Sequence, residues 1–407
     1  MPARYWLETL GCPKNQVDSD KLVGTLEADG FVAAAGVDDA DLVVVNTCAF
    51  IEAARQESID TVLALSEARR PGARLVVTGC LAERYGAELA SALPEADAVA
   101  GFGVPVTLTA KVPRFDLLNL PRPRSPVPWA YVKVAEGCDR TCGFCAIPSF
   151  RGKQRSRSVA AILDEVEQLD VAEVVLVAQD LASYGRDVGQ RRAIVPLVRA
   201  VAARVARTRL LYLYPSELDD ALVDAVCDTG VPYFDLSLQH ASKPLLRRMR
   251  RWGDGERFLR RIHSIRAREP EAAFRSSFIV GYPGETEDDH DVLLRFVGEA
   301  DLDWAGFFAF SREEGTHAAG LDGVVDHSLV AERLCELTDL QDRITARRRD
   351  ALVGREVDVL VDTRGIGRTH REAPEIDGIV AVPDFLVPGS FGRLSVTAAI
   401  GPDLEAA

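Results

Sequence analysis

The chain has 407 residues, more than one compact hydrophobic core normally holds, so two or three domains are expected. Its 48 basic and 62 acidic residues give a net charge of −14, which argues against an obligate nucleic-acid binder and favours a basic partner. No stretch approaches the roughly 18 apolar residues of a membrane span, and the N-terminus lacks a signal-peptide pattern, so we expect a cytosolic protein without membrane contact.

The first hundred residues alternate between strand and helix patterns, which is typical of a parallel sheet covered by helices. The predicted strands are residues 5–10, 41–46, 75–78 and 96–101. The first three strands are each followed closely by a cysteine, namely Cys12, Cys48 and Cys80. Because the C-terminal ends of parallel strands share one edge of a sheet, we expect these thiols to converge. The alternative is three unrelated buried thiols, which would make the repeated placement a coincidence.

A second series of strand–helix units follows a segment, residues 112–128, that has five prolines and is predicted to be an extended linker. The predicted strands of this series are residues 130–135, 173–178, 209–213, 233–237, 274–280 and 304–310. Six such units predict a partial β/α barrel with its active site at the C-terminal strand ends. Gln179, Gln239, Gly281 and Glu285 stand at those ends.

The last part of the chain has a different texture. A long charged helix is predicted at residues 331–350, and short alternating strands follow, punctuated by Gly and Pro, as in a small antiparallel β-barrel. The predicted fold class is therefore α/β, with a parallel α/β domain, a partial β/α barrel and a C-terminal barrel. The corresponding limits are residues 1–111, 112–128 for the linker, 129–350 and 351–407.

The strongest chemical signal is the segment Glu136-Gly-Cys138-Asp-Arg-Thr-Cys142-Gly-Phe-Cys145. Three thiolates from one loop can bind three corners of a four-iron cluster and leave the fourth iron open to a cofactor or substrate. A structural zinc site usually needs a fourth ligand, and none lies close by in the sequence. A redox dithiol would use Cys142 and Cys145 alone. Two further cysteines, Cys227 and Cys335, lie in helical patterns and are predicted to be buried.

The loop and its surroundings resemble the methylthiotransferase branch of the radical S-adenosylmethionine (SAM) superfamily. The resemblance rests on the Cys138–Cys145 spacing, on residues 131–138 and on residues 146–157. That branch has an N-terminal domain with three cysteines, a radical SAM barrel and a C-terminal TRAM domain, so the resemblance covers nearly the whole chain.

Three segments resemble the enzymes of this branch that modify a ribosomal protein: residues 9–15, 238–242 and 371–378. The tRNA-modifying enzymes usually have Gln and Met where Pro13 and Lys14 stand. The resemblance therefore implies methylthiolation of an aspartate β-carbon in ribosomal protein S-twelve of the small subunit. From Asp350 onwards ten acidic residues face five arginines, which suits docking to a basic protein.

The family chemistry implies a role for each cysteine triad. Cys138, Cys142 and Cys145 would hold the cluster that cleaves SAM to form a radical. Cys12, Cys48 and Cys80 would hold a second four-iron cluster, where sulfur awaits the substrate. An electron donor and a sulfur donor are further expected partners.

Several weaker predictions accompany these. Phe144, Gln179, Gln239, Gly281 and Glu285 are candidate SAM-binding residues, although turn chemistry alone could explain the last two. The basic run at residues 247–251 is predicted to be a solvated helix face. Asp20 and His317 depart from the residues that the family often has.

Two other functions stay open at this point. One is the same chemistry on a tRNA adenosine, and the other is a non-catalytic, metal-stabilised RNA-binding protein. The acidic charge does not favour direct RNA binding, but the sequence leaves it open.

Overall fold

The N-terminal domain is built on a parallel sheet with strand order β2-β1-β3-β4-β5. The structure, a computed structural model, describes residues 2–102 and 116–407. The strands of this sheet are β1 (Arg4–Thr9), β2 (Val32–Ala33), β3 (Leu42–Thr47), β4 (Arg74–Gly79) and β5 (Ala98–Ala100). Its helices are α1 (Pro13–Ala28), η1 (Val37–Asp39), α2 (Glu52–Ala68) and α3 (Cys80–Ala92). In this order β2 lies on one side of β1, and β3, β4 and β5 lie on the other side. The strand order therefore reverses between β1 and β3, and ligands bind at such reversal points in open parallel sheets.

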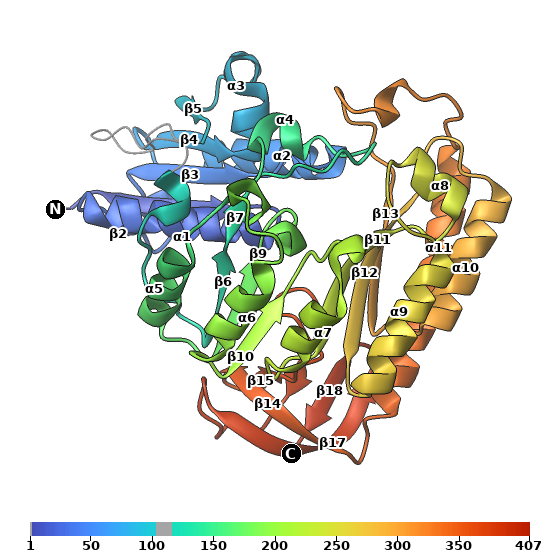
Figure 1. The fold of residues 1–407 in the computed structure, drawn as a ribbon. Coiled ribbons are helices and arrows are strands. Elements are labelled where there is room, and N and C mark those ends of the chain that lie inside the picture. Colours follow the sequence, from blue (N-terminus) through green and yellow to red (C-terminus); the bar gives the residue numbers. More distant parts are fainter. Residues whose placement is uncertain (1, 103–115) are drawn as a thin grey trace.

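The central part is an open barrel made of two parallel three-stranded sheets, β6-β9-β10 and β11-β12-β13, which a single bridge between Leu213 and Leu236 joins. Its strands are β6 (Trp129–Lys133), β9 (Glu173–Val177), β10 (Arg207–Leu210), β11 (Tyr233–Gln239), β12 (Ala273–Val280) and β13 (Trp304–Ala309). The outer helices are α5 (Val159–Leu169), α6 (Ile194–Ala202), α7 (Asp220–Cys227), α8 (Lys243–Arg248), α9 (Gly255–Arg268), α10 (Glu287–Ala300) and α11 (His327–Asp350). These helices lie outside the arc of strands (Figure 1), so the predicted six-unit partial barrel is confirmed.

Short elements decorate the loops of this barrel. They are the helix α4 (Ile147–Arg151), the hairpin strands β7 (Ala135–Glu136) and β8 (Arg155–Ser156), and the short helices η2 (Asp116–Asn119), η3 (Leu181–Ser183), η4 (Arg186–Val188), η5 (Pro215–Glu217) and η6 (Ala318–Gly320). The β7–β8 hairpin encloses the segment that contains Cys138, Cys142 and Cys145.

Helix α5 illustrates how the sequence builds the outer layer. The Ser158 side chain accepts a hydrogen bond from the Ala161 amide and so starts the helix. Ile162, Val166 and Leu169 then follow at spacings of four and three residues, and each is 4% exposed or less. Burial of each such side chain against the strands contributes about 1.5–3 kcal/mol.

The C-terminal domain is a closed barrel with strand order β14-β15-β16-β18-β17. Its strands are β14 (Glu356–Thr363), β15 (Ile366–Arg368), β16 (Val380–Ala381), β17 (Phe391–Ile400) and β18 (Asp403–Ala406). All neighbouring strands are antiparallel except β16 and β18, which pair in parallel. The predicted small β-barrel is thus present, with one parallel pair that the sequence did not indicate.

The segment between β15 and β16 closes the N-terminal end of the central barrel. The Tyr131 hydroxyl donates to the Pro374 carbonyl at 2.8 Å, and the Trp304 indole donates to the Arg371 carbonyl at 2.6 Å. Ala373 is fully buried among these aromatic residues. The C-terminal barrel therefore lies below the central strands, and the N-terminal domain lies above their C-terminal ends (Figure 1).

The predicted linker is fastened to the rest of the protein wherever the structure describes it; residues 112–115 lie outside the described part. The Lys21 ammonium donates to the Leu120 carbonyl at 2.7 Å. Arg122 forms ion pairs with Asp20 at 2.7 Å and with Glu165 at 2.9 Å. This segment is therefore a strap between α1 and α5, and Asp20, one of the two departures, holds it.

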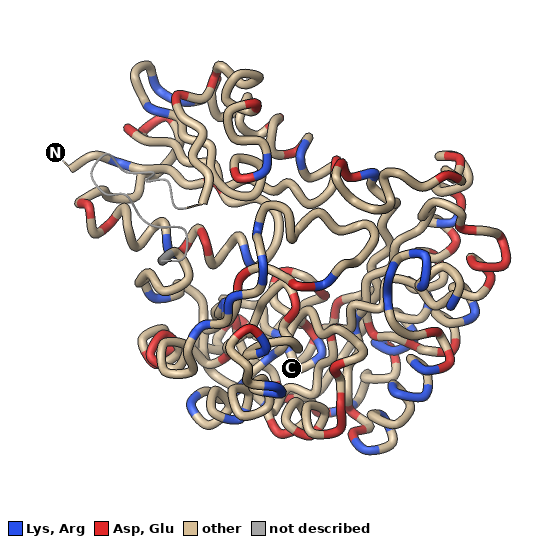
Figure 2. The backbone as a smooth tube through the Cα atoms, turned by 45° about the horizontal axis from the view of Figure 1, so that its top comes forward, with Lys and Arg blue, Asp and Glu red and all other residues tan. Residues whose placement is uncertain are grey.

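Basic and acidic residues are interspersed along the described chain (Figure 2). Within residues 2–102 and 116–407, no helix combines the length and the apolar character that crossing a membrane requires.

Candidate functional site

Cys12, Cys48 and Cys80, called the N-terminal triad here, lie along one edge of the N-terminal sheet. Cys12 caps α1 just after β1, Cys48 follows β3 directly, and Cys80 opens α3 after β4. These three strands are neighbours, so topology brings together thiols that are far apart in sequence. Burial raises the pKa of Cys48 and of Cys80, and the Cys12 sulfur adds to both shifts while the Cys80 sulfur adds to that of Cys48. The predicted convergence is what the structure shows.

Asn15 and Gly11 hold the three strand ends close together. The Asn15 amide donates to the Leu10 carbonyl at 2.9 Å and to the Thr47 carbonyl at 3.1 Å. Gly11 has φ of +96°, and a Cβ atom there would lie 2.8 Å from Cys48 Cβ. A side chain at position 11 would therefore collide with a triad residue, so the close approach requires glycine.

Arg151, at the end of α4, reaches from the central barrel into the N-terminal triad. It is 3% exposed, and its Nη2 lies 2.9 Å from Cys80 Sγ and 2.6 Å from Asn15 Oδ1. Its Nη1 lies 3.1 Å from Glu136 Oε2. Burial alone would raise the pKa of Glu136, but the charges of Arg151 and Lys133 outweigh it and hold that pKa well below its usual range. A buried charged network thus joins the N-terminal triad to Glu136, two residues before Cys138.

Cys138, Cys142 and Cys145, called the loop triad here, lie between β7 and α4. The Arg251 Nη1 lies 3.2 Å from Cys142 Sγ, and the Arg140 amide lies 3.4 Å from Cys138 Sγ. Nitrogen donors thus point at the sulfur atoms of both triads, as they do at thiolates that ligate iron. This arrangement fits a negatively charged metal centre at each triad.

The loop triad is held in place by tight packing at Gly143. The Gly143 amide donates to the Met249 carbonyl at 2.8 Å, and its own carbonyl accepts from the Ala318 amide at 2.8 Å. A Cβ atom at Gly143 would lie 2.8 Å from the Tyr282 hydroxyl. The loop therefore rests on the turn after β12, which contains Tyr282.

The acidities of the thiols differ within the N-terminal triad. Burial raises the pKa of Cys48 to about 12, and the neighbouring Cys12 sulfur acts in the same direction. Burial acts likewise on Cys12, but the positive charges of Lys14 and Arg151 outweigh it and lower its pKa. Metal binding requires thiolates, so loading of a metal centre here must release protons from the thiols whose pKa values are raised, Cys48 and Cys80.

The number and spacing of the thiols bear on whether a triad could hold a cluster or a single metal ion. No three His, Cys, Asp or Glu side chains within residues 2–102 and 116–407 are spaced to hold one metal ion. In a four-iron cluster each thiolate binds a different iron, so the thiolates stand further apart than the ligands that share one tetrahedral zinc ion. In the loop triad, Cys145 interacts electrostatically with both Cys142 and Cys138, so three thiols gather there and not two. Each triad thus offers three thiol ligands, one fewer than a structural zinc site usually has.

The predicted SAM-binding residues Gln179 and Gln239 lie at strand ends of the central barrel, and Phe144 lies in the cysteine loop. Gln179 Nε2 donates to Glu136 Oε1 at 2.6 Å, while its buried Oε1 has no hydrogen-bond partner among the described residues. Gln239 ends β11 with φ of +71°, a strained conformation for a residue with a side chain. Phe144 is half-buried and packs against the barrel core. A role for each in binding SAM stays a prediction.

Gly281 and Glu285 bound the turn after β12, and the structure gives the Glu285 carboxylate a structural task. Its Oε2 accepts hydrogen bonds from the amides of Gly281 at 2.6 Å and Tyr282 at 3.2 Å. Its Oε1 pairs with Arg333 of α11 at 3.0 Å. Both oxygens are therefore used to shape the turn on which the cysteine loop rests. The backbone of Gly281 stands at the same strand-end face as Gln179 and Gln239.

One sequence-based prediction was wrong, and another holds only in part. Cys335 is exposed, because it falls on the solvent side of α11, and Cys227 is half-buried. The basic run at residues 247–251 is not uniformly solvated: Arg251 is 9% exposed and its guanidinium lies 4.4 Å from the Tyr214 ring centroid. The sequence reasoning also missed Arg151, although it stands inside the segment that carried the family resemblance.

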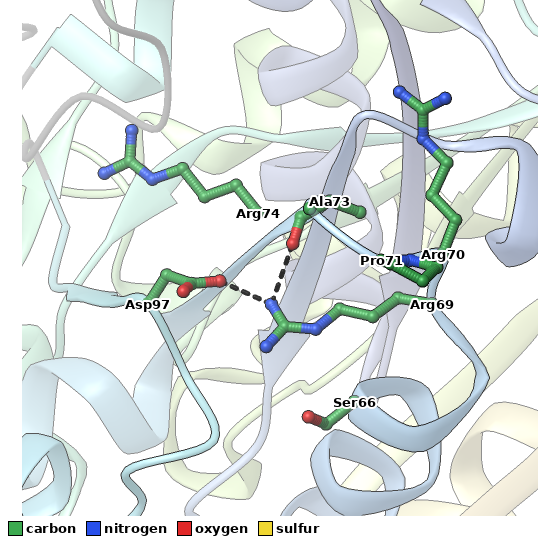
Figure 3. A pocket seen from close by; sticks show the side chains of 8 residues that line it. Ser66, Arg69, Arg70, Pro71, Ala73, Arg74 and Asp97 are labelled. Carbon is green, nitrogen blue, oxygen red and sulfur yellow. Dashed lines mark hydrogen bonds and ion pairs between the residues drawn. The ribbon is translucent and has the colours of Figure 1, made fainter.

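A hollow of about 540 Å³ on the N-terminal domain lies away from both triads. It is lined where α2 ends and β4 begins, whereas Cys80 follows the other end of β4. Arg69 fills part of it by bonding to the Ala73 carbonyl and to Asp97 (Figure 3). This hollow is not part of the candidate site.

Comparisons with known proteins agree with this geometry. Residues 4–101 match the family described as "Uncharacterized protein family UPF0004", residues 132–297 match the radical SAM superfamily, and residues 353–407 match the TRAM domain. The radical SAM superfamily implies a four-iron–four-sulfur cluster and SAM as cofactors.

Individual relatives identify the family within the radical SAM superfamily. The ribosomal protein uS12 methylthiotransferase RimO of Cutibacterium acnes is 42% identical over 93% of this chain and 92% of its own length. The protein of the same name from Salinispora tropica is 41% identical over 99% of this chain and 95% of its own length. The solved radical SAM methyltransferase TsrM from Kitasatospora setae is 16% identical, with a TM-score of 0.49 over 75% of this chain and 73% of TsrM. The chain therefore belongs to the RimO family of radical SAM methylthiotransferases.

Proposed function

We propose that this enzyme transfers a methylthio group to the β-carbon of an aspartate in ribosomal protein uS12, and that it does so with two four-iron clusters. The loop triad would hold one cluster and the N-terminal triad the other. The observation that carries this proposal is the pair of triads, which Arg151 and Glu136 join at the strand-end face of the central barrel. The loop triad alone would suffice for SAM cleavage, so the second triad is the feature that points to sulfur transfer.

The groups that would be bound supply the chemistry: the loop cluster with SAM provides a radical that removes a substrate hydrogen, and the second cluster provides the methylated sulfur. The protein's own residues hold the two sites in register. Gln179, Gln239 and Gly281 stand at the strand ends, where SAM would lie over the loop triad. Arg151 and Arg251 donate to one sulfur atom of each triad and so offset its negative charge.

The docking of uS12 is supported by the charge of the C-terminal barrel. Several charged residues of the C-terminal barrel are buried where it meets the central barrel. Arg368, for instance, pairs with Glu173 of the central barrel at 3.1 Å. The exposed charged residues are still mostly acidic: Asp350, Glu356, Asp358, Glu375, Asp384 and Glu405 against Arg355, Arg364 and Arg393. A basic ribosomal protein complements such a surface, whereas the phosphate backbone of tRNA does not. The tRNA alternative is therefore not favoured.

Several further assignments belong to the same proposal. The domain limits are residues 1–111, 112–128, 129–350 and 351–407, and the protein works in the cytoplasm. It also needs an electron donor to reduce the loop cluster and a sulfur donor to resupply the second.

The test is anaerobic reconstitution with iron and sulfide, followed by incubation with SAM, a reductant and either uS12 or tRNA. We expect the mass of uS12 to rise by one methylthio group in place of a hydrogen, on a peptide that contains an aspartate. A modified tRNA nucleoside beside unmodified uS12 would overturn the substrate. Incorporation of a single zinc ion without SAM cleavage would contradict the two-cluster proposal.

A further inference from the structure

Lys14 is a buried cation without an acidic partner, unlike the other buried lysines that the structure describes. Lys21 lies 3.1 Å from the Glu165 carboxylate, and Lys133 lies 2.8 Å from the Glu136 carboxylate. Lys14 is 9% exposed, its Nζ lies 3.3 Å from the centroid of the Tyr212 ring, and its charge also acts on the neighbouring Cys12 sulfur. A buried charge without a counter-ion costs several kcal/mol, and a cation–π contact returns only about 2. Among the described residues no carboxylate therefore pairs with Lys14, and Cys12 is the neighbouring group that can carry negative charge.

Lys14 stands where the two domains face each other. It lies in the first turn of α1, two residues after Cys12 of the N-terminal triad. Tyr212 follows β10 of the central barrel by two residues, and its backbone has φ of +67°. Cys12 and Tyr212 are both half-buried, so the surroundings of Lys14 at this domain boundary are partly open to solvent.

Asp235, which contacts the Tyr212 backbone, is already committed elsewhere. Asp235 accepts a hydrogen bond from the Tyr212 amide at 2.9 Å through one oxygen and pairs with Arg275 at 3.2 Å through the other. It fixes the Tyr212 backbone and does not neutralise Lys14. No carboxylate of the described residues therefore pairs with the Lys14 ammonium, and a ligand can supply one.

We propose that Lys14 binds the carboxylate of the substrate aspartate and so holds its β-carbon beside the N-terminal triad. The proposal rests on the function inferred above, in which that carbon receives the methylthio group. The carboxylate carbon is bonded directly to the β-carbon, so an ammonium that holds the carboxylate fixes the reacting carbon one bond away. The other role open to Lys14 is to offset the charge of a cluster at the N-terminal triad.

The experiment compares the reconstituted wild-type enzyme with Lys14→Met, which keeps the length of the side chain without its charge, and with Lys14→Arg. Lys243→Met is the matched control, because Lys243 is exposed at the start of α8. We expect Lys14→Met to raise the KM for uS12 at least tenfold, Lys14→Arg to recover part of the loss, and Lys243→Met to behave as wild type. An unchanged KM in Lys14→Met would overturn the proposal.

A binding measurement tests the same contact without turnover. The wild-type enzyme should bind uS12 at least tenfold more tightly than a uS12 variant with Asn at the target aspartate, and Lys14→Met should bind the two equally. Equal binding of both forms by the wild-type enzyme would also overturn the proposal. Loss of iron from the N-terminal triad in Lys14→Met, with discrimination between Asp and Asn retained, would assign Lys14 to charge compensation instead. Failure of the wild-type enzyme to modify uS12 at all would count against the proposed function and not against this contact.

Discussion

The two cysteine triads present the same ligand chemistry on opposite kinds of scaffold. The loop triad comes from one short segment, and its thiols stay neighbours however the rest of the chain is arranged. The N-terminal triad comes from the ends of β1, β3 and β4, and it exists only while that sheet is folded. The spacing of residues along the chain determines a site of the first kind, whereas the order of strands in the sheet determines a site of the second kind. The predictions below test whether the two triads differ in function as they differ in construction.

The largest expected effect is a difference in activity between variants of the two triads. Cys142→Ala removes a ligand from the loop triad and should abolish both SAM cleavage and methylthio transfer. Cys48→Ala removes a ligand from the N-terminal triad and should abolish transfer while some SAM cleavage persists. Each variant should lose about half of the reconstituted iron, because each triad is proposed to hold one cluster of the same type.

Iron content, SAM cleavage under reductant and the mass of uS12 together check this prediction. Transfer that survives Cys48→Ala would show that the N-terminal triad does not carry the sulfur. Loss of SAM cleavage in both variants would show that the triads form one functional unit, and the contrast between them would then be one of architecture alone.

The two triads also differ in how directly the sequence predicted them. The spacing of Cys138, Cys142 and Cys145 identifies the loop triad directly. The N-terminal triad required a second step, in which three strand ends were placed on one edge of a parallel sheet, and that step succeeded because β3 and β4 are unbroken runs of buried residues. Strands as short as β2 and β18 have too little periodicity to be detected.

The residues that the sequence did not reveal are the long cationic side chains around the sulfur atoms. Arg151 and Arg251 approach Cys80 and Cys142 from other elements, and the direction of a flexible side chain depends on packing that no local pattern encodes. Cys335 shows the converse error, since an apolar neighbourhood on a helix did not place it on the buried side.

The second prediction compares those two arginines by stability. Arg151→Met should lower the free energy of unfolding by about 3–5 kcal/mol, because it removes a cation that pairs with buried carboxylates. Asp18 lies 2.9 Å from that guanidinium and Glu136 lies 3.1 Å away. Arg251→Met should lower the free energy of unfolding by about 1–3 kcal/mol, since the Arg251 guanidinium contacts a thiol, a carbonyl and an aromatic ring.

Unfolding monitored by circular dichroism on the metal-free proteins would measure the difference. Arg260→Met is a suitable control, because Arg260 and its partner Glu256 are both exposed at 3.5 Å separation, and such pairs contribute little. A larger loss in Arg251→Met than in Arg151→Met would mean that the loop triad, and not the N-terminal triad, depends more on its neighbouring cation.

The smallest expected effect concerns the thiols of the metal-free protein. The positive charges of Lys14 and Arg151 outweigh burial and lower the pKa of Cys12, whereas burial raises the pKa of Cys48 to about 12 and that of Cys145 to about 12. The thiolate is the reactive form, so iodoacetamide near neutral pH should label Cys12 before the other two. The labelling rate of Cys12 should level off below the pH of about 8.5 at which free cysteine titrates.

Mass spectrometry of the labelled peptides would follow each cysteine separately, with exposed Cys335 as the reference for an accessible thiol. In Lys14→Met the removal of one positive charge should raise the pKa of Cys12, lower its thiolate fraction at a given pH and slow its labelling. Cys48 and Cys145 should change little, because Lys14 is not among the groups that shift their pKa values. If Cys145 were labelled first, the loop triad would be the more reactive site without metal. The order of reactivity would then follow the openness of the loop and not the charges that the fold collects around the strand ends.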